Sequence, residues 1–358
     1  MSDSGQPIKG YVTTQGFTNA GGGQCQWTFA KKGGRHYFLK RFLRPTYPLP
    51  DGPGSAAIKA RKRQECEHFE QRQRGIIQRL KPLSTTGGNL VVARDFFRHG
   101  AHYYKATDKV DVASEDPSGI AALSGGDNLI VLLAVAHSLD ILHRSGLVHG
   151  DIKPANILVK RTSTGVTSKL IDFDDCFVDR EPPPAAETVG DPVYYAPEMV
   201  DYIVDNGPAE LLSVKSDVFA LGLVFAEYLT GSLPDLPAGH RYPGEAVRAG
   251  ARLRLSVPTG RAPVVELVEA MLSAEPALRP SCREVHEALQ RIRRARREGA
   301  STSGLRPSEK PEETGAESTG LQGTLLRKLA SRRDSPAEPT KPPLRGSLLK
   351  KAKDRPAP

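Results

Sequence analysis

The chain of 358 residues is long enough for one large domain or two ordinary ones, and its hydrophobic content of 38% suffices to bury a core. Its four cysteines are scattered without C-x-x-C spacing, which argues against a disulfide framework or a zinc site and favours free thiols in a reducing cytosol. The net charge of +9 resides after residue 290, where 17 Lys and Arg residues accompany 8 Asp and Glu residues.

The N-terminal part predicts a small sheet around a glycine-rich turn. It begins with polar residues that lack the pattern of a signal peptide, and residues 11–17 are expected to form a first strand. The letters TNAGGG predict a turn, and residues 24–42 alternate around a KKGG turn as a β-hairpin does. A glycine turn above two strands lets backbone amides approach phosphate groups, so Gly21, Gly22 and Gly23 are candidate phosphate contacts.

A charged helix and a second pair of strands come next. Residues 44–55 are rich in proline and glycine and predict a loop, residues 56–80 a charged helix, and residues 89–110 two strands. From residue 127 to 146, apolar residues recur at the spacing of a core helix. Its apolar run, residues 129–142, is too short and too polar to span a bilayer. We therefore expect a cytoplasmic protein without a transmembrane segment.

The stretch HGDIKPANILV, residues 149–159, brings together three side chains suited to phosphate chemistry. Asp151 can accept a proton from a hydroxyl group, Lys153 can neutralise phosphate charge, and Asn156 offers a carbonyl oxygen to a hard cation. Single residues of these types on a loop are usually just solvated, but here the spacing D-x-K-x-x-N directly precedes an apolar strand. A second strand, KLIDFDD, ends in acids, and its Asp172 can hold the same Mg²⁺ ion as Asn156.

Three further motifs lie downstream. They are YYAPE at residues 194–198, SDVFALGLV at 216–224 and LRP at 278–280. The second is apolar nearly all round, which predicts a buried helix, and closing helices are expected at residues 264–272 and 282–294. The chain after residue 298 is rich in Ser, Pro, Gly and charged residues and has no aromatic residue, so we expect it to be disordered.

Five motifs of the chain, in this order, resemble those of the eukaryotic-type (Hanks-type) serine/threonine protein kinases. They are HGDIKPANILV, LIDFD, YYAPE, SDVFALGLV and LRP. The chain therefore looks like a divergent member of this family. The resemblance covers roughly residues 10–295. It implies an α+β fold of two lobes. The N-lobe, residues 10–110, would hold a small antiparallel β-sheet and one helix. The C-lobe, residues 111–298, would be larger and mainly α-helical, followed by a disordered basic tail, residues 299–358.

The resemblance also implies a role for each candidate residue. Asp151 and Lys153 would be catalytic, and Lys153 is the family feature that points to serine and threonine acceptors. Asn156 and Asp172 would hold Mg²⁺. The substrate nucleotide would be ATP, with Lys40 and the glycine turn at its phosphates.

Three more roles follow from the family. A glutamate on the charged helix would pair with Lys40 and order the site. Glu70 is the first choice for it and Glu67 the second. Asp217 would hold the backbone amides of the catalytic loop. A structural ion pair is expected between Glu198 and Arg279.

The sequence departs from the family pattern at four places. Gly150 replaces the arginine of the HRD motif, Asp174 the glycine of DFG, and Asp191 a threonine before APE. The glycine turn also lacks the full G-x-G-x-x-G spacing. Since Asp151, Lys153 and the metal and phosphate residues are all present, we favour an active kinase. A pseudokinase or nucleotide-binding scaffold that acts through its tail is the alternative, and a small-molecule phosphotransferase is a third reading.

The basic tail carries the remaining expectations about partners. It contains a repeat, LQGTLLRKLA at residues 321–330 and LRGSLLKKAK at 344–353, with Thr324 and Ser347 at matching positions. An acidic partner or autophosphorylation there is one reading, and an inert solvated tail or a chance repeat the other. We expect no nucleic-acid partner, because the tail has no interleaved aromatic residues. The implied function is transfer of phosphate from ATP to serine or threonine of protein substrates in signal transduction.

Overall fold

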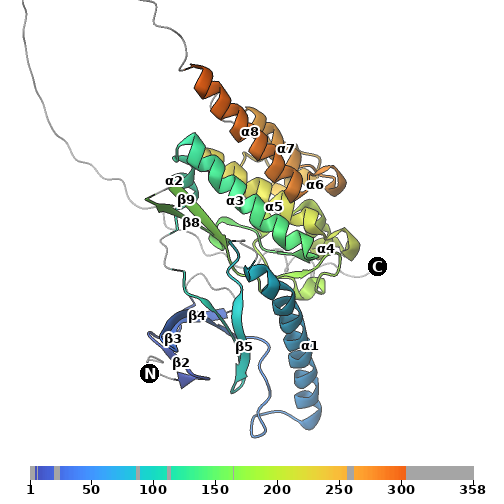
Figure 1. Cartoon of the computed structure of the whole chain (residues 1–358). Coiled ribbons are helices and arrows are strands. Elements are labelled where there is room, and N and C mark those ends of the chain that lie inside the picture. Colours follow the sequence, from blue (N-terminus) through green and yellow to red (C-terminus); the bar gives the residue numbers. More distant parts are fainter. Residues whose placement is uncertain are drawn as a thin grey trace, which may run out of the picture. The chain divides into compact units, whose positions relative to one another are not determined.

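Figure 1 shows the chain as a computed structural model. It describes residue 5 and residues 7–19, 25–85, 89–110, 114–163, 165–255 and 262–303. The chain divides into two units, Met1–Ala295 and Arg296–Pro358, and every described element except the end of the last helix belongs to the first. The expected glycine turn at Gly21, Gly22 and Gly23 lies outside the described residues, as does the expected disordered tail beyond residue 303.

A six-stranded antiparallel sheet forms the N-lobe. Its strands are β1 (Pro7–Ile8), β2 (Tyr11–Thr13), β3 (Cys25–Lys32), β4 (Arg35–Phe42), β5 (Ala93–His99) and β6 (His102–Asp108), in the order β1-β2-β3-β4-β6-β5. Gly33 and Gly34 both have positive φ and form the two-residue turn of the β3–β4 hairpin, a conformation that side chains with a β-carbon disfavour. The expected hairpin is thus present. The strand expected at residues 11–17 is β2, which ends at Thr13, and the short strand β1 precedes it.

Helix α1 (Ala56–Leu80) covers this sheet. The Ser55 side chain caps it by accepting a hydrogen bond from the backbone N–H of Ile58 at 3.3 Å. Its buried residues recur at seven, three and four positions, the spacing of one helix face; they are Cys66, Gln73, Ile76 and Leu80. Cys66 joins the cluster of Phe42, Phe96 and Tyr103 on the sheet. The helix is therefore attached through a narrow face, and its other sides carry charged residues.

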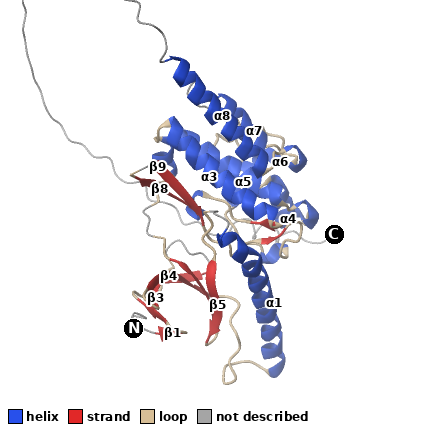
Figure 2. Cartoon of the chain, viewed as in Figure 1, coloured by secondary structure: helices blue, strands red, loops and turns tan. Residues whose placement is uncertain are grey.

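The C-lobe is mainly helical (Figure 2). Its helices are α2 (Pro117–Ala121), α3 (Gly125–Arg144), α4 (Pro197–Asp205), α5 (Val214–Thr230), α6 (Pro243–Arg248), α7 (Ala262–Met271) and α8 (Cys282–Ser303). The core is built around α3 and α5, whose apolar residues are almost all buried. A capping box of Ser213 and Ser216 begins α5, and Gly231, with a φ of 86°, ends it. The all-round apolar pattern of this segment therefore did indicate a buried helix.

Helix α3 is longer than the apolar run predicted at residues 129–142. With these added residues, its length and mean hydropathy are those of a membrane span. Of its most apolar stretch, 61% is buried inside the molecule. Its hydropathy is thus accounted for by packing against the rest of the C-lobe, including β9 and α5.

Two short two-stranded sheets connect this helical core to the chemistry-bearing loops. Strand β7 (Leu147–Val148) pairs with β10 (Phe177–Val178), and β8 (Ile157–Thr162) pairs with β9 (Gly165–Leu170). The stretch between β7 and β8 contains the predicted catalytic loop. The predicted metal strand, residues 169–175, starts at the end of β9, and its acids lie in the loop between β9 and β10. Because each of these two loops runs from one strand pair to the other, the loops lie side by side.

The predicted α+β, two-lobed class is confirmed by this arrangement, with a curled antiparallel sheet and one helix in the N-lobe and a larger helical C-lobe. One boundary differs. Helix α8 runs to Ser303, five residues into the stretch that we expected to be disordered. The turns just before these five residues are rich in Arg, a strong helix former, and the helix continues through them into GASTS.

Candidate active site

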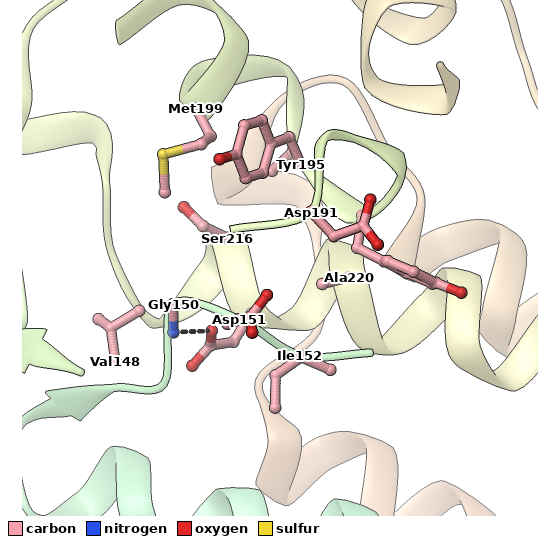
Figure 3. A pocket seen from close by; sticks show the side chains of 12 residues that line it. Val148, Gly150, Asp151, Ile152, Asp191, Tyr195, Met199, Ser216 and Ala220 are labelled. Atoms are coloured by element: carbon pink, nitrogen blue, oxygen red, sulfur yellow. Dashed lines mark hydrogen bonds between the residues drawn. The ribbon is translucent and has the colours of Figure 1, made fainter. Parts of the chain in front are cut away.

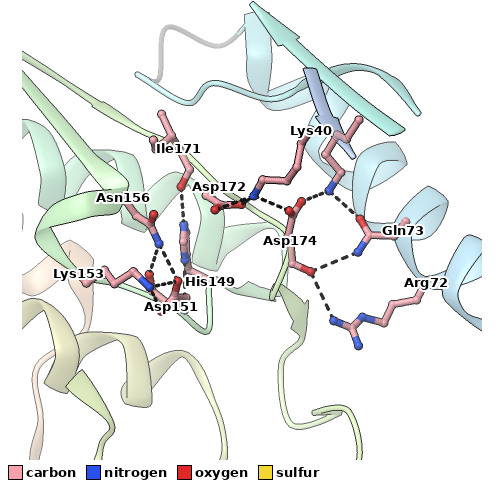
Figure 4. A network of polar contacts seen from close by, with 11 residues as sticks. Lys40, Arg72, Gln73, His149, Asp151, Lys153, Asn156, Ile171, Asp172 and Asp174 are labelled. Carbon is pink, nitrogen blue, oxygen red and sulfur yellow. Dashed lines mark hydrogen bonds and ion pairs between the residues drawn. The ribbon is translucent and has the colours of Figure 1, made fainter. Parts of the chain in front are cut away.

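The predicted catalytic loop is held together by contacts among its own residues (Figure 4). The Lys153 ammonium donates to Asp151 Oδ1 at 2.9 Å, and the Asn156 side-chain amide donates to the Asp151 backbone carbonyl at 2.7 Å and to Asp151 Oδ2 at 2.8 Å. Since both N–H groups of Asn156 face Asp151, its carbonyl oxygen faces the opposite way. One carboxylate is thus fixed beside an ammonium, and one amide oxygen is presented to a cation.

A buried carboxylate on α5 fixes the start of this loop. Asp217 is 2% exposed and accepts hydrogen bonds from the backbone N–H groups of His149, at 2.6 Å, and Gly150, at 3.0 Å. His143 on α3 lies 2.9 Å from the same carboxylate. These contacts are the ones that the family resemblance implied for Asp217. They tie the loop to the two core helices.

Gly150 occupies a place where no side chain fits. Its φ is +78°, and a β-carbon built there would lie 2.7 Å from the backbone oxygen of Asp175 and 3.3 Å from the Phe177 ring. The loop and the metal strand therefore approach each other through this glycine. The arginine that the family carries here would require a different course of one of the two segments.

Strand β4 and the metal strand meet through Lys40. Its ammonium contacts Asp172 at 2.7 and 2.8 Å and Asp174 Oδ2 at 2.7 Å (Figure 4). Asp172 has a φ of +65°, a conformation that Asp tolerates better than most residues. The Ile171 backbone N–H donates to the Asn156 backbone carbonyl at 3.0 Å, which places Asp172 next to the catalytic loop. The structure thus brings Lys40, Asp172 and Asn156 into one region, as the sequence predicted.

The expected pair between Lys40 and a helix glutamate is not formed in this structure. Glu70 is half-buried and lies 2.7 Å from Arg74, one turn along α1, so its carboxylate is engaged within the helix. The helix residue that reaches the site is Gln73, which is 1% exposed. The sequence does hold a signal for Gln73. Its spacing from Cys66 and Ile76 places the three residues on one helix face.

A second lysine, Lys105 on β6, was not recognised in the sequence. It is 7% exposed, forms an ion pair with Asp174 and donates to Gln73 Oε1 at 2.6 Å. A signal was available, because Lys105 interrupts the otherwise apolar and aromatic run YYKA, but strand lysines are usually solvated. Its burial depends on α1 covering this face of the sheet.

The charges in this cluster shift one another's pKa values. Burial lowers the pKa of Lys40, but Asp174 and Asp172 outweigh it and raise the pKa overall. Burial raises the pKa of Asp174, but Lys105 and Lys40 bring it well below the usual value. The pKa of Asp172 is raised, by burial and then by Asp174. Of the two carboxylates that contact Lys40, Asp172 therefore has the less compensated charge, which fits a group that binds a cation.

The residues present suit Mg²⁺ coordinated in part by phosphate. Within the described ranges, no group of three or more His, Cys, Asp or Glu residues is arranged to hold a metal ion. One carboxylate, from Asp172, and one amide oxygen, from Asn156, are available instead. Mg²⁺ is commonly bound by one or two carboxylates together with substrate phosphates and water, so this set fits the ion only in the presence of a nucleotide.

A small hollow lies beside Asp151 (Figure 3). Its lining includes Asp151, Asp191, Tyr195 and the start of α5 at Ser216. Asp191 accepts a hydrogen bond from the Val193 backbone N–H at 3.1 Å, so it caps the short turn that leads to the YYAPE motif. Asp151 and Asp191 thus both line this hollow.

A buried ion pair supports this side of the C-lobe. Arg279 is 1% exposed and contacts both Glu198 oxygens, at 2.7 and 2.8 Å. Further guanidinium N–H groups donate to backbone carbonyls, including that of Ser273 at 2.8 Å, and the Ser216 hydroxyl donates to Glu198 at 2.7 Å. The pair expected between Glu198 and Arg279 is present, and its polar atoms are well satisfied.

Two lobes joined through a lysine–aspartate contact, with an Asp-Lys-Asn loop beside it, define a protein-kinase-like class. Among solved structures, the kinase PK-1 of the Cydia pomonella granulovirus is similar in fold, with a TM-score of 0.52 and 17% identity over 74% of this chain and 90% of that one. A family profile described as the protein kinase domain matches residues 55–289. The chain belongs to the protein kinase family.

Curated relatives agree with this placement at modest identity. The serine/threonine-protein kinase STY17 of Arabidopsis thaliana is 26% identical over 231 residues, which are 62% of this chain and 35% of the relative. The serine/threonine-protein kinase PkaA of Streptomyces coelicolor is 27% identical over 253 residues, 66% of this chain and 43% of the relative. The match therefore spans less than half the length of these two relatives, and its low identity fits a divergent Hanks-type kinase.

Proposed function

We propose that the protein transfers the γ-phosphoryl group of ATP to serine or threonine hydroxyl groups of protein substrates, with Mg²⁺ as cofactor. The observation that carries the proposal is the paired arrangement of the loop carboxylate Asp151, held by Lys153 and Asn156, and the Lys40–Asp172 contact on the neighbouring strand. The first set serves the acceptor and the second serves the nucleotide.

Each residue then has one chemical task. Asp151 orients the acceptor hydroxyl and takes its proton as the new O–P bond forms and the bond between the γ-phosphorus and the leaving ADP oxygen breaks. Lys153 stabilises the charge of the phosphoryl group in transfer. Lys40 contacts the nucleotide phosphates. Most of the acceleration would come from positioning and electrostatic stabilisation.

Magnesium would be held by Asp172 and Asn156 and, when bound, would neutralise charge on the phosphate oxygens. The raised pKa of Asp172, caused by burial and by Asp174, supports this assignment, because a bound cation would relieve the unfavourable charge. Lys40 must then release at least one Asp172 oxygen to reach the phosphates.

The preference for serine and threonine rests on Lys153 and on the kinds of relatives that the chain matches. A cytoplasmic role in signal transduction and an acidic partner for the basic tail belong to the same proposal. The tail residues concerned lie outside the part of the chain that the structure describes.

The decisive test is phosphate transfer to a generic acceptor such as casein, with purified full-length protein, radiolabelled ATP and Mg²⁺. We expect transfer by the wild type. In Asp151→Asn, transfer should fall by about 10²–10⁴-fold, the usual contribution of a general base, while ATP binding persists, because Asp151 has no assigned metal contact. Wild-type-like labelling by Asp151→Asn would refute the assignment.

The alternative is a pseudokinase that binds nucleotide without transferring phosphate. The departures at Gly150, Asp174 and Asp191 favour it, since each lies near the loop or the metal strand. Binding of Mg-ATP without detectable transfer by the wild type, under conditions in which a known kinase labels the same acceptor, would support this reading.

A further inference from the structure

Four charged side chains alternate in sign between the metal strand and the sheet (Figure 4). Lys40 lies between Asp172 and Asp174, and Asp174 lies between Lys40 and Lys105. Side-chain exposure is 15% for Lys40, 11% for Asp174 and 8% for Lys105. Charges this buried interact with little screening by solvent, so their arrangement fixes where Lys40 points.

The sheet register explains how two lysines come to share one carboxylate. Lys40 on β4 is directly opposite Lys105 on β6, so both side chains emerge on the same face. Two ammonium groups at that distance would repel each other without an anion between them. Asp174 supplies one, with Oδ2 on Lys40 and Oδ1 on Lys105.

Helix α1 contacts this cluster through the backbone carbonyl oxygen of Asp174. Gln73 donates to the backbone oxygen of Asp174 at 3.2 Å, and Arg72 contacts the same oxygen at 3.4 Å. Gln73 also accepts from Lys105 at 2.6 Å. The carboxylate that α1 might have offered, Glu70, is engaged by Arg74. The helix thus holds Asp174 in place but contributes no carboxylate to Lys40.

We propose that Asp174, neutralised by Lys105 and attached to α1 by Gln73, is the positioning residue of Lys40, so that the carboxylate orienting this lysine comes from the metal strand and not from the helix. This inference rests on the proposed function in one respect, namely that Lys40 serves the nucleotide phosphates. When Asp172 takes up a cation, Lys40 keeps one anionic partner in Asp174. Lys105 keeps Asp174 compensated when Lys40 turns towards the phosphates.

The first measurement needs no nucleotide. Amines of the folded protein are labelled competitively with acetic anhydride, and the rate at Lys40 is read by mass spectrometry relative to the exposed Lys31. We expect Asp174→Asn to raise the Lys40 rate on the order of tenfold, the effect of losing one charge-assisted hydrogen bond. Glu65→Gln, which removes an exposed carboxylate of α1 paired with Arg61, is the matched control and should leave the rate unchanged.

Asp174→Asn leaves Lys105 buried beside a neutral partner and can destabilise the fold. The double variant Asp174→Asn/Lys105→Met removes both charges and should restore the thermal midpoint to near the wild-type value. Lys40 labelling should stay high in the double variant, because the Asp174 carboxylate is still absent. A rate that returns to the wild-type value with the restored midpoint would mean that Asp174 acts only through stability, and would overturn the proposal.

The second measurement is kinetic. In Asp174→Asn and in the double variant, KM for ATP should rise on the order of tenfold, while KM for the protein acceptor stays within about twofold, since the acceptor site does not contact Lys40. The competing assignment predicts that Glu70→Gln has these effects. A rise in KM for ATP and in Lys40 labelling with Glu70→Gln, and none with Asp174→Asn, would contradict the inference.

The two ideas fail in different ways. If the wild type neither binds Mg-ATP nor transfers phosphate, the proposed function is wrong, and the labelling result still decides whether Asp174 holds Lys40. If the wild type is active and labelling of Lys40 is insensitive to Asp174→Asn, only the positioning role is wrong.

Discussion

A single hydrogen atom in place of a side chain determines how closely the catalytic loop approaches the metal strand. Gly150 has a positive φ, and its α-carbon faces the Asp175 carbonyl so closely that a β-carbon would lie 2.7 Å from that oxygen. Contacts below 3.0 Å of this kind require one of the two backbones to move. The proximity of Asp151 to the strand that carries Asp172 therefore depends on this glycine.

Gly150→Ala should lower the free energy of unfolding by about 2–4 kcal/mol, from the cost of a left-handed conformation and from steric overlap together. Gly146→Ala is a matched control, since Gly146 also has positive φ, +73°, but has no atom within 4 Å of a built β-carbon. Its cost should be about 1–2 kcal/mol. Urea unfolding of both variants measures the difference, and equal destabilisation would show that the contact with Asp175 is unimportant.

Asp172 should be required for nucleotide binding in a way that depends on the metal. In Asp172→Ala, we expect Mg-ATP to lose its stabilising effect on thermal unfolding, which for the wild type amounts to about 2.7 kcal/mol at a ligand concentration of 100 Kd. ATP with EDTA gives the metal-free reference for both proteins. Undiminished stabilisation of the variant by Mg-ATP would show that the metal is held elsewhere.

At the scale of elements, the C-lobe depends on one buried ion pair between α4 and the turn before α8. Glu198 and Arg279 make two hydrogen bonds to each other and are almost completely buried. A buried pair of this kind contributes little net stability relative to apolar residues. Removing one partner, however, leaves the charge of the other buried and unpaired, which is costly.

Arg279→Met should therefore destabilise the protein by about 3–5 kcal/mol, because it leaves the Glu198 carboxylate buried and unpaired. Adding Glu198→Gln should recover a large part of this loss, since the remaining amide is neutral. A double-mutant cycle from urea unfolding gives the coupling. Additive losses in the two single variants and the double variant would mean that the pair is not energetically coupled.

The contrast between α1 and the catalytic loop shows what a sequence can predict. Asp151, Lys153 and Asn156 lie within six consecutive residues, so their proximity follows from local chain geometry and is readable in the letters. The partner of Lys40 is 134 residues away, and the choice between Glu70 and Gln73 depends on the rotation of α1 about its axis. A rotation by one position changes which side chain faces the sheet, and the helix has few apolar residues to define it.

Lys105 illustrates a second limit. A lysine on a strand is usually exposed, and its burial here results from α1, Gln73 and Asp174 arriving from other parts of the chain. The departure at Asp174 was visible in the sequence as added charge near the metal. Its compensation by Lys105 was not, because the two are 69 residues apart and share no motif.

At the scale of the whole molecule, the tail beyond α8 is a candidate substrate of the kinase to which it is attached. A tethered segment has an effective concentration on the order of mM for short linkers and less for longer ones. Thr324 and Ser347 occupy matching positions in the repeat, each followed by two leucines and a basic pair. Added phosphate would reduce the positive charge of the tail and weaken its binding to an acidic partner.

We expect Thr324 and Ser347 to become phosphorylated when the full-length protein is incubated with Mg-ATP, and to remain unmodified in Asp151→Asn. Mass spectrometry of tail peptides measures both. Dilution of the protein should leave the initial rate per molecule unchanged if the reaction is within one chain. Phosphate confined to residues before Gly299 would end this proposal.

The cluster around Asp174 also bears on selective inhibition. A small molecule bound beside Lys40 and extended towards α1 would meet two ammonium groups and the Gln73 amide. Because the Asp174 side chain already lies between the two lysines, a carboxylate or tetrazole on such a compound can contact both ammonium groups only where that side chain is displaced or neutral. Acidic extensions should therefore gain more affinity for Asp174→Asn than for the wild type, and the gain should disappear when Lys105 is also replaced by methionine.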